Sequence, residues 1–268
     1  MGQRIAVLGT GKMGEALVSG MLRAGKPVDE VLVTARRSER AAELADRYGV
    51  ATVSNAEAAK QADTLILTVK PQDMAALLAE LAPHIPADRL VVSGAAGITT
   101  EFVAGRLGVE GLPVVRVMTN TPVLVDEAMS AISPGAHAAE EHLRRTEEIF
   151  HPVGRTIRVP ESQQDAVTAL SGSGPAYFYF LVEAMIDAGI LLGIPRATAH
   201  ELIVQSAVGA GVMLRDSGEH PVILRDAVTS PAGTTIAAIR ELEKHGVRAA
   251  FLAAIEAARD RGRELGDS

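Results

Sequence analysis

Three glycines near the N-terminus constrain the fold of this 268-residue chain more than any other feature. Gly9, Gly11 and Gly14 follow a short apolar run at residues 4–8 and precede a helical pattern over residues 13–24. Glycines at this spacing, between a strand and a helix, are typical of a phosphate-binding turn in a parallel sheet. The first allows a tight turn, the second lets a pyrophosphate approach the backbone, and the third lets the helix pack on the strand. The alternative is a glycine-rich turn that binds no ligand.

Strand and helix patterns alternate over the first 160 residues. Apolar runs predict buried strands at residues 31–35, 64–69, 90–93 and 114–118, and helical patterns between them cover residues 39–48, 74–81 and 100–107. Such alternation is typical of a parallel sheet covered by helices on both faces. Residues 128–132 and 155–159 are expected to extend the sheet at one edge.

The strand signal stops after residue 160. Helices are predicted over residues 165–170, 176–192, 197–214, 222–227, 235–244 and 247–265. We therefore expect an α/β Rossmann-type doubly wound sheet over residues 1–160, followed by an all-α domain over residues 161–268. The helix at 176–192 is apolar almost all round, and about 110 residues of helical domain can hardly bury it alone. We expect two subunits to enclose it in a homo-oligomer.

Composition excludes several classes of function. The net charge is −7 and there is no Lys/Arg cluster, which argues against a nucleic-acid surface. There is no cysteine, so disulfides, thiolate metal sites and a cysteine nucleophile are excluded. His137 and His142 are five residues apart, off the i,i+4 register, and no metal site is expected. His220 is expected to start a helix.

The sequence also indicates where in the cell the protein is expected. The longest apolar run, residues 176–182, is too short for a membrane span. The chain starts directly with a strand pattern and shows no leader sequence. We therefore expect a cytoplasmic protein with no membrane contact.

The end of the second predicted strand indicates which nucleotide is bound. An NAD site usually has an acidic residue there, about 20 residues after the glycines, to hold the ribose hydroxyl. This chain has Arg36, Arg37 and Ser38 instead. Two guanidiniums and a hydroxyl suit a 2′-phosphate, so the sequence favours NADP, with NAD as the less favoured nucleotide. The alternative is that both arginines are ordinary solvated charges.

Other candidate ligand residues follow strands at the same edge of the predicted sheet. Lys70 and Pro71 close the strand at 64–69, the small residues 94–97 follow the strand at 90–93, and Asn120 follows the strand at 114–118. Open α/β sheets bind ligands at the carboxyl ends of their strands. Small residues allow a flat ring to lie against the backbone, and Asn120 could bond a carboxamide or a substrate. Ordinary capped turns are the alternative at each position.

A second anion-binding pattern lies in the helical half. Residues 230–235 read Ser-Pro-Ala-Gly-Thr-Thr and precede the amphipathic pattern 235–244. Free N–H groups at a helix N-terminus attract a carboxylate or a phosphate, and we expect such an anion to dock on Ser230 and on Gly233, Thr234 and Thr235. The alternative is a plain helix N-cap.

The ordered motifs identify a family. The chain resembles the Δ1-pyrroline-5-carboxylate reductase family over nearly its whole length. The resemblance depends on residues 9–14, Val-Lys-Pro at 69–71, Ala-Ala-Gly at 95–97, Met-Thr-Asn-Thr-Pro at 118–122, Leu-Ser-Gly-Ser-Gly-Pro-Ala-Tyr at 170–177, Gly-Glu-His-Pro at 218–221, and residues 230–235. The first motif occurs in many dehydrogenases, whereas the last, combined with the stretch at 170–177, is close to diagnostic.

The resemblance implies reduction of the cyclic imine 1-pyrroline-5-carboxylate to proline with NADPH, and a helical domain that interlocks into a dimer or a pentamer of dimers. It implies substrate contacts at Glu161, Ser230, Thr234 and Thr235, facing the cofactor of a partner subunit. The implied cofactor contacts are Leu8, Gly9, Thr10, Gly11, Lys12, Met13, Arg36, Ser38, Asn55, Thr68, Val69, Lys70, Pro71, Gly94, Ala95 and Ala96. Two residues depart from the family pattern: Ala232 stands where the family usually has glycine, and Ala227 stands where some relatives have an asparagine that touches the ligand. Thr119 stands where many members have proline, although threonine also occurs in the family.

Thr235 is the candidate catalytic residue, as hydrogen-bond partner or proton relay for the imine nitrogen. Its alternative is a purely structural role in the first helical turn. Two rival functions remain open. The first is a related imine or β-hydroxyacid reductase, although residues 175–193 lack the lysine that hydroxyacid enzymes usually place there. The second is a non-catalytic NADP-binding regulator.

Overall fold

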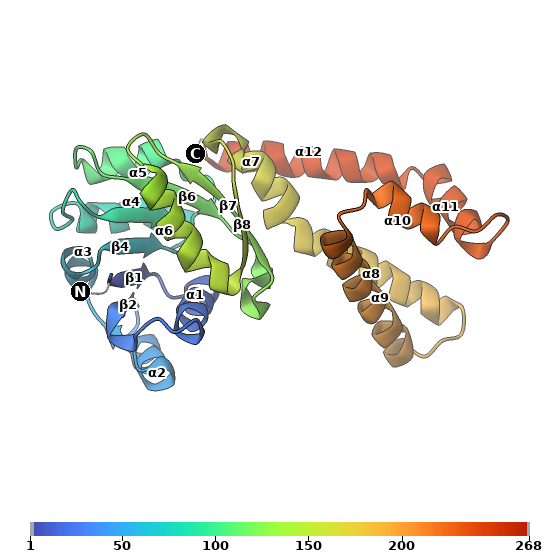
Figure 1. The fold of residues 1–268 in the computed structure, drawn as a ribbon, viewed down its shortest axis with the longest axis horizontal. Helices are drawn as coiled ribbons and strands as arrows, with labels where there is room; N and C mark the ends of the chain where they lie inside the picture. Colours follow the sequence, from blue (N-terminus) through green and yellow to red (C-terminus); the bar gives the residue numbers. More distant parts are fainter. Residues whose placement is uncertain (1–2, 267–268) are drawn as a thin grey trace. The chain divides into compact units, whose positions relative to one another are not determined.

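The computed structural model describes residues 3–266. They form two compact units: residues up to Ser173 together with those from Ala258 onward, and residues Gly174–Ala257. The first contains the sheet, and the second is built from helices (Figure 1). Each unit is described separately below.

The sheet unit has eight strands in the order β3-β2-β1-β4-β5-β6-β7-β8. All neighbouring strands run parallel except β6 and β7, which are antiparallel. After β3 the chain crosses to the other side of β1, so the strand order reverses between β1 and β4. Reversals of this kind create ligand crevices in open α/β sheets. The strands are β1 (Ile5–Leu8), β2 (Val31–Thr34), β3 (Ala51–Thr52), β4 (Thr64–Leu67), β5 (Leu90–Ser93), β6 (Val114–Met118), β7 (Ala128–Pro134) and β8 (Gly154–Arg158).

Side chains alternate between two apolar layers, as strand geometry requires. Ile5 and Val7 of β1 pack into one cluster, with helices α1 (Lys12–Arg23), α2 (Ser38–Tyr48) and α6 (Glu140–Phe150). Ala6 and Leu8 face the other cluster, with α3 (Asn55–Gln61), α4 (Pro71–Leu81) and α5 (Thr100–Leu107). Because helices cover both faces, the central strands are buried and read as continuous apolar runs. Short 3₁₀ turns cover Val28–Glu30, Thr121–Val125 and His151–Val153.

The structure confirms the predicted alternating pattern and the two edge strands, but the sequence prediction missed three elements. These are β3, α3 and α6. A signal for α3 was present, because Ser54 and Glu57 form a capping box in which each side chain bonds the backbone N–H of the other. The strand predicted to reach Val69 ends at Leu67, and the two following residues border the pocket described below.

The sheet unit extends beyond the predicted boundary at residue 160. Residues Glu161–Gln163 form a 3₁₀ turn, followed by α7 (Gln164–Val167) and a π-helical turn at Thr168–Gly172. The side chain of Gln164 is fully buried and donates to Ser133 Oγ at 2.7 Å and to the Ala131 carbonyl at 3.1 Å. These bonds join α7 to β7. The predicted boundary between residues 160 and 161 therefore lies where the strands end and the helices begin, whereas the compact sheet unit continues to Ser173. A functional division of the chain at residue 160 stays a proposal.

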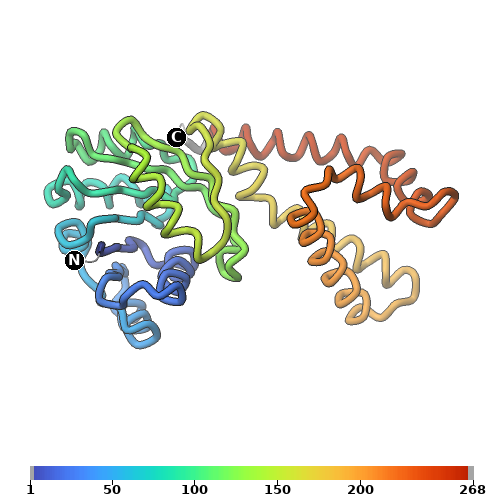
Figure 2. Tube along the Cα trace, in the orientation of Figure 1, coloured from blue at the N-terminus to red at the C-terminus, as the bar shows by residue number. Residues whose placement is uncertain are grey.

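The helical unit contains α8 (Gly174–Leu191), α9 (Arg196–Ser217), α10 (Pro221–Ala227), α11 (Thr234–Lys244) and most of α12 (Val247–Gly266). Helices α8 and α9 lie side by side (Figure 2). At Gly189 of α8, an added Cβ would lie 2.9 Å from the Cβ of Ala199, so the missing side chain permits this close crossing. His220 caps α10 by accepting a hydrogen bond from the Val222 N–H, which confirms its predicted structural role.

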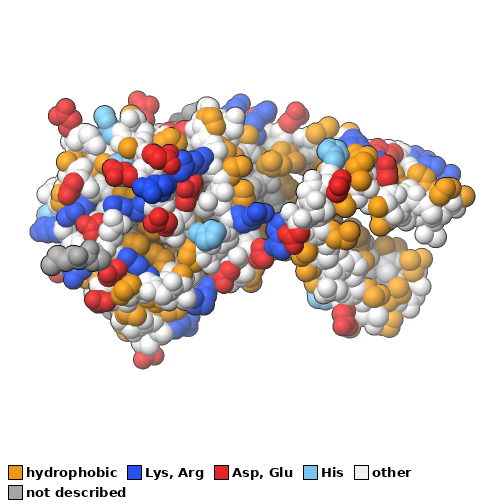
Figure 3. Space-filling view, in the orientation of Figure 1, with side chains coloured by type: hydrophobic (Ala, Val, Ile, Leu, Met, Phe, Trp, Pro, Cys, Tyr) orange, Lys and Arg blue, Asp and Glu red, His pale blue; other side chains and the backbone are white. Residues whose placement is uncertain are grey.

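Helix α8 is largely exposed within the single chain. Phe178, Tyr179 and Phe180 have relative exposures of 68%, 66% and 70%, and only Gly174 and Ile186 of this helix are buried. Further apolar side chains are exposed on α9, α10 and α11, and hydrophobic atoms are visible across the surface of these helices (Figure 3). Exposed apolar patches of this kind mark association surfaces.

One continuous helical stretch of the described chain, Glu161–Leu191, is long and apolar enough to cross a membrane by length and composition alone. The sequence prediction considered only the run at 176–182, which is shorter because it stops at Glu183. A helix that is covered by a second subunit satisfies the same criterion, so this property does not by itself indicate a membrane.

Candidate active site

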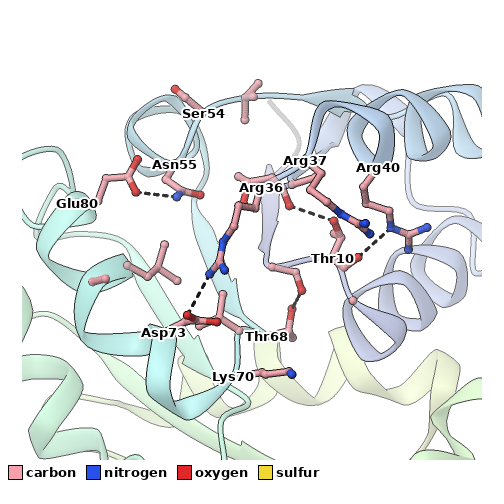
Figure 4. A pocket seen from close by; sticks show the side chains of 18 of the residues that line it. Thr10, Arg36, Arg37, Arg40, Ser54, Asn55, Thr68, Lys70, Asp73 and Glu80 are labelled. Carbon is pink, nitrogen blue, oxygen red and sulfur yellow. Dashed lines mark hydrogen bonds and ion pairs between the residues drawn. The ribbon is translucent and has the colours of Figure 1, made fainter.

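A pocket of about 1000 Å³ lies at the carboxyl ends of β1, β2 and β4 (Figure 4). It is the crevice expected where the strand order reverses. The lining residues come from the glycine turn, the β2–α2 loop, the start of α3 and helix α4. They are Gly9, Thr10, Gly11, Thr34, Ala35, Arg36, Arg37, Arg40, Val53, Ser54, Asn55, Thr68, Val69, Lys70, Gln72, Asp73, Ala76, Leu77 and Glu80.

The structure confirms the predicted turn at Gly9 and the predicted packing role of Gly14, whereas the pyrophosphate contact at Gly11 stays a prediction. Gly9 has φ +88°, and an added Cβ would lie 2.5 Å from Val69 Cγ1. A Cβ on Gly14 would lie 2.8 Å from Thr68 Oγ1, so this glycine lets α1 pack against the strands. A Cβ on Gly11 would meet nothing within 4 Å. Gly11 therefore borders open space in the pocket, where a pyrophosphate could approach the backbone.

Two threonines fix the glycine turn. Thr68 Oγ1 lies 3.1 Å from the Leu8 carbonyl and 3.0 Å from the Gly9 carbonyl. Thr10 Oγ1 donates to the Thr34 carbonyl at 3.0 Å, which joins the turn to the end of β2. The turn is thus held from both neighbouring strands.

Four cationic side chains line the pocket. Arg36 Nη2 lies 3.1 Å from Asp73 Oδ1 of α4. Within the described part of the chain, no carboxylate lies within ion-pair distance of Arg37 or Lys70. Arg37 and Lys70 are therefore two pocket cations whose charges no carboxylate pairs, which suits a ligand that carries several phosphates.

The fourth cation, Arg40, was missed by the sequence analysis. Its Nε donates to the Thr10 carbonyl at 3.2 Å, and its guanidinium also bonds Glu15 of α1 and Glu43. Burial raises the pKa of Glu15, but hydrogen bonds from Arg40 and Tyr48 outweigh that effect, so its pKa lies below the ordinary value. This network joins α1 to α2 behind the glycine turn. No local pattern could reveal the place of Arg40 in the pocket, because Thr10 and Glu15, which hold it there, are distant in sequence.

Several predicted cofactor residues are not part of the pocket lining: Leu8, Lys12, Met13, Gly14, Ser38, Pro71, Gly94, Ala95, Ala96 and Asn120. An added Cβ on Gly94 would lie 3.7 Å from Thr68 Cγ2 and 3.9 Å from Met13 Sδ, which places the turn after β5 next to the glycine turn. Sequence reasoning missed Ser54, Asp73 and Glu80, which α3 and α4 bring to the pocket.

The amide of Asn120 is bonded within the protein. Its Oδ1 accepts from the Met129 N–H at 3.0 Å, and its Nδ2 donates to the Ser171 carbonyl at 3.2 Å. The side chain therefore joins the end of β6 to the segment that precedes α8. A contact between Asn120 and a cofactor stays a prediction.

Glu161 is also engaged within the sheet unit. Its carboxylate accepts hydrogen bonds from both the N–H and the hydroxyl of Thr100, at the start of α5. It also lies 3.6 Å from Arg116 of β6, which is only 4% exposed and has Asp165 at 3.7 Å on its other side. Glu161 thus helps neutralise a buried arginine, and a substrate contact at this residue stays a prediction.

Residues 230–235 form a turn that ends at α11. Gly233 is the N-cap, its N–H donates to the Ser230 carbonyl at 3.1 Å, and no side chain caps the helix. An added Cβ on Gly233 would lie 2.3 Å from Ser230 Oγ, so the missing side chain leaves room for that hydroxyl. The first N–H groups of α11 therefore lack a side-chain acceptor, as a docking site for an external anion requires. Ala232 has φ +57°, a conformation that favours glycine.

No group of three or more His, Asp or Glu side chains that could hold a metal ion occurs within residues 3–266. The histidine spacing had predicted no metal site. The sites that the described chain does present are a cationic pocket in the sheet unit and an uncapped helix N-terminus in the helical unit.

Known proteins are similar to this chain. The family model described as pyrroline-5-carboxylate reductase dimerisation matches residues 161–265, and the model described as NADP oxidoreductase, coenzyme F420-dependent, matches residues 4–97. A pyrroline-5-carboxylate reductase from Corynebacterium melassecola is 47% identical over 266 residues, covering 98% of both chains. One from Methanosarcina acetivorans is 43% identical over the same shares.

Solved structures agree. A pyrroline-5-carboxylate reductase structure from Coxiella burnetii matches with a TM-score of 0.94 and 34% identity over 98% of both chains. A pyrroline carboxylate reductase structure from Plasmodium falciparum, with NADP bound, matches with a TM-score of 0.87 and 27% identity, again over 98% of both chains. Full-length identity of this order, together with the glycine turn and the uncapped start of α11, shows that the chain belongs to the pyrroline-5-carboxylate reductase family.

Proposed function

We propose that this protein reduces 1-pyrroline-5-carboxylate to L-proline with NADPH as hydride donor, the last step of proline biosynthesis. The observation that carries the proposal is that a pocket lined by cationic side chains and an uncapped helix N-terminus occur together in a member of this family. The pocket suits a dinucleotide with an added phosphate, and the helix N-terminus suits the carboxylate of a small imino acid.

The pocket residues fit NADP. The open space at Gly11 admits a pyrophosphate close to the backbone, which a side chain there would obstruct. Arg36 and Arg37 at the end of β2 supply cations for a 2′-phosphate, and no acidic residue stands at that strand end. When bound, the cofactor supplies the hydride. The protein supplies binding, orientation and electrostatics.

The substrate carboxylate docks on the N–H groups that follow Gly233, with Ser230, Thr234 and Thr235 adding hydroxyls. These groups sit on a helix start whose dipole favours negative charge. A fixed carboxylate orients the imine ring. The entropy of orienting the substrate is then lost on binding and no longer adds to the barrier of the chemical step. Glu161 remains a proposed substrate contact from the family resemblance.

Thr235 is the proposed partner of the imine nitrogen. A cyclic imine is basic enough to be partly protonated near neutral pH, so a strong general acid is unnecessary. A hydroxyl can hold the N–H of the iminium by accepting its hydrogen bond, or relay a proton to the nitrogen. Thr235 lies in the first turn of α11, next to the docking N–H groups.

The activity is tested by the loss of NADPH absorbance in the presence of 1-pyrroline-5-carboxylate. Thr235→Val should lower kcat and leave NADPH affinity unchanged, because it removes the hydroxyl and preserves the shape. Arg36→Asp should weaken NADPH binding far more than NADH binding. An unchanged rate in the first variant rules out Thr235, and equal losses in the second rule out the assignment of Arg36.

Two other functions make different predictions. A β-hydroxyacid reductase would need an acid/base lysine, and residues 175–193, which include all of α8 after its first residue, contain neither Lys nor Arg. A non-catalytic regulator would bind NADPH and show no turnover with the imine. A comparison of NADPH oxidation with the imine and with hydroxyacid or ketoacid substrates separates the three possibilities.

The family's dimerisation model matches the helical unit, and the apolar faces of α8 to α11 are exposed in one chain, so the protein is a homo-oligomer. We propose a dimer, assembling further into a pentamer of dimers, in the cytoplasm. Sedimentation of the purified protein tests the oligomer size. A monomer at micromolar concentration would contradict the proposed role of α8.

A further inference from the structure

Two polar bridges cross the cofactor pocket, and both start from α4 (Figure 4). Asp73, in the first turn of α4, pairs with Arg36 at 3.1 Å. Glu80, two turns further along, accepts a hydrogen bond from Asn55 Nδ2 at 2.9 Å. Arg36 and Asn55 are the residues that the family resemblance assigns to the cofactor. Each is held by an α4 carboxylate.

Asp73 pairs with the guanidinium of Arg36, the same group that a 2′-phosphate would bind. Arg36 is 79% exposed and extends over the pocket, whereas Asp73 is 35% exposed. Only Nη2 of the guanidinium lies near Asp73, so a bidentate phosphate contact that includes Nη2 requires this atom to leave the carboxylate. Asp73 also adds a negative charge beside the place where a phosphate with two charges would lie.

We propose that Asp73 competes with the 2′-phosphate of NADPH for Arg36 and thereby sets the preference of the protein between NADPH and NADH. The inference rests on the proposed function of the pocket. NADPH must displace Asp73 from Arg36, whereas NADH has no 2′-phosphate and leaves the pair intact. Arg37, which no carboxylate pairs in the described structure, provides a phosphate contact that is not subject to this competition.

Asp73→Asn should therefore tighten NADPH binding about three- to ten-fold, the range expected for removing a half-exposed ion pair and one repulsion. NADH affinity should stay within about two-fold. The gain should shrink at high salt, because exposed charges are screened. Asparagine keeps the shape of aspartate and removes its negative charge.

The experiment measures dissociation constants of NADPH and NADH by nucleotide fluorescence in the wild-type oligomer, Asp73→Asn and Glu80→Gln. Glu80→Gln is the matched control, because it removes one negative charge from the same helix and pocket without touching Arg36. It should change the affinities for both nucleotides in parallel. Asp73→Ser, which also removes the carboxylate, provides a second test of the same site.

A double-mutant cycle with Arg36→Gln separates competition from simple repulsion. If Asp73 acts through Arg36, Asp73→Asn gains clearly less NADPH affinity in the Arg36→Gln background than in the wild type, where only the direct repulsion of the phosphate is left to remove. Unchanged or weaker NADPH binding in both Asp73 variants would overturn the proposal, as would a gain of the same size with and without Arg36. A wild-type protein that binds neither nucleotide would instead refute the proposed function, so the two failures are distinguishable.

Discussion

Replacing Gly9 with alanine tests whether the glycine turn is shaped by its contact with Val69. Gly9 has φ +88°, and a left-handed conformation costs an alanine about 1–2 kcal/mol. The added Cβ would lie 2.5 Å from Val69 Cγ1 and 3.0 Å from its N atom, and overpacking of this kind costs about 1–3 kcal/mol. The two effects predict a loss of about 2–5 kcal/mol in the free energy of unfolding.

In a chain of this length, 1 kcal/mol corresponds to about 2–4 °C in melting temperature, so Gly9→Ala should melt about 4–20 °C lower. Gly11→Ala is the matched variant. Its Cβ would meet nothing within 4 Å, and its φ of −73° suits alanine. As an N-cap substitution it should cost at most about 1 kcal/mol. Gly11→Ala should instead lose NADPH affinity, because the new methyl group obstructs the approach of the pyrophosphate.

The assay combines thermal unfolding by circular dichroism with NADPH titration for the wild type and both variants. Gly105→Ala, at an open position in the interior of α5, controls for the general effect of replacing glycine, and should melt at or above the wild-type temperature. The reasoning is refuted if Gly9→Ala melts with the wild type, or if Gly11→Ala binds NADPH normally.

Three further predictions follow from the contacts described above. Ala232→Gly should raise the melting temperature, since alanine at φ +57° costs about 1 kcal/mol more than glycine; a lower melting temperature would contradict that strain. Glu161→Gln should cost about 1–3 kcal/mol in thermal unfolding, because the buried guanidinium of Arg116 would keep only one carboxylate; an unchanged melting temperature would show that Asp165 suffices. Glu15 has a lowered pKa in the folded protein, so its stabilising effect is present above pH 4.5 and is lost as the pH falls below it; Glu15→Gln should therefore flatten the acid side of a melting-temperature profile, and an unaltered profile would count against the Arg40 network.

Some of the predicted site residues could be placed from local sequence order alone. Gly9, Gly11 and Gly14 are close in sequence, and their roles follow from local backbone requirements, so the motif alone predicted the turn and its position after β1. Arg36 and Arg37 follow β2 directly, and a strand that ends at the sheet edge delivers both to the pocket. Such residues can be predicted because chain direction and element order place them.

The pairings of those residues could not be predicted in the same way. Arg36 meets Asp73, Arg40 meets Glu15, and Thr100 lies 61 positions before Glu161, its partner. Each pair joins elements whose relative placement depends on packing across the sheet. The sequence placed Glu161 at the substrate by resemblance, whereas the structure shows its contacts with Thr100 and Arg116.

The sequence by itself determined the alternating sheet, the helical second half, the glycine turn and the family, because these depend on periodicity, chain order and local conformation. Only the tertiary structure decided that β7 runs antiparallel to β6, that α3 brings Asn55 to the pocket, and that an α4 carboxylate already holds Arg36. The physical reason is that charge pairing and burial are properties of neighbours in space. A sequence lists the charges, and packing determines which of them remain free to bind a ligand.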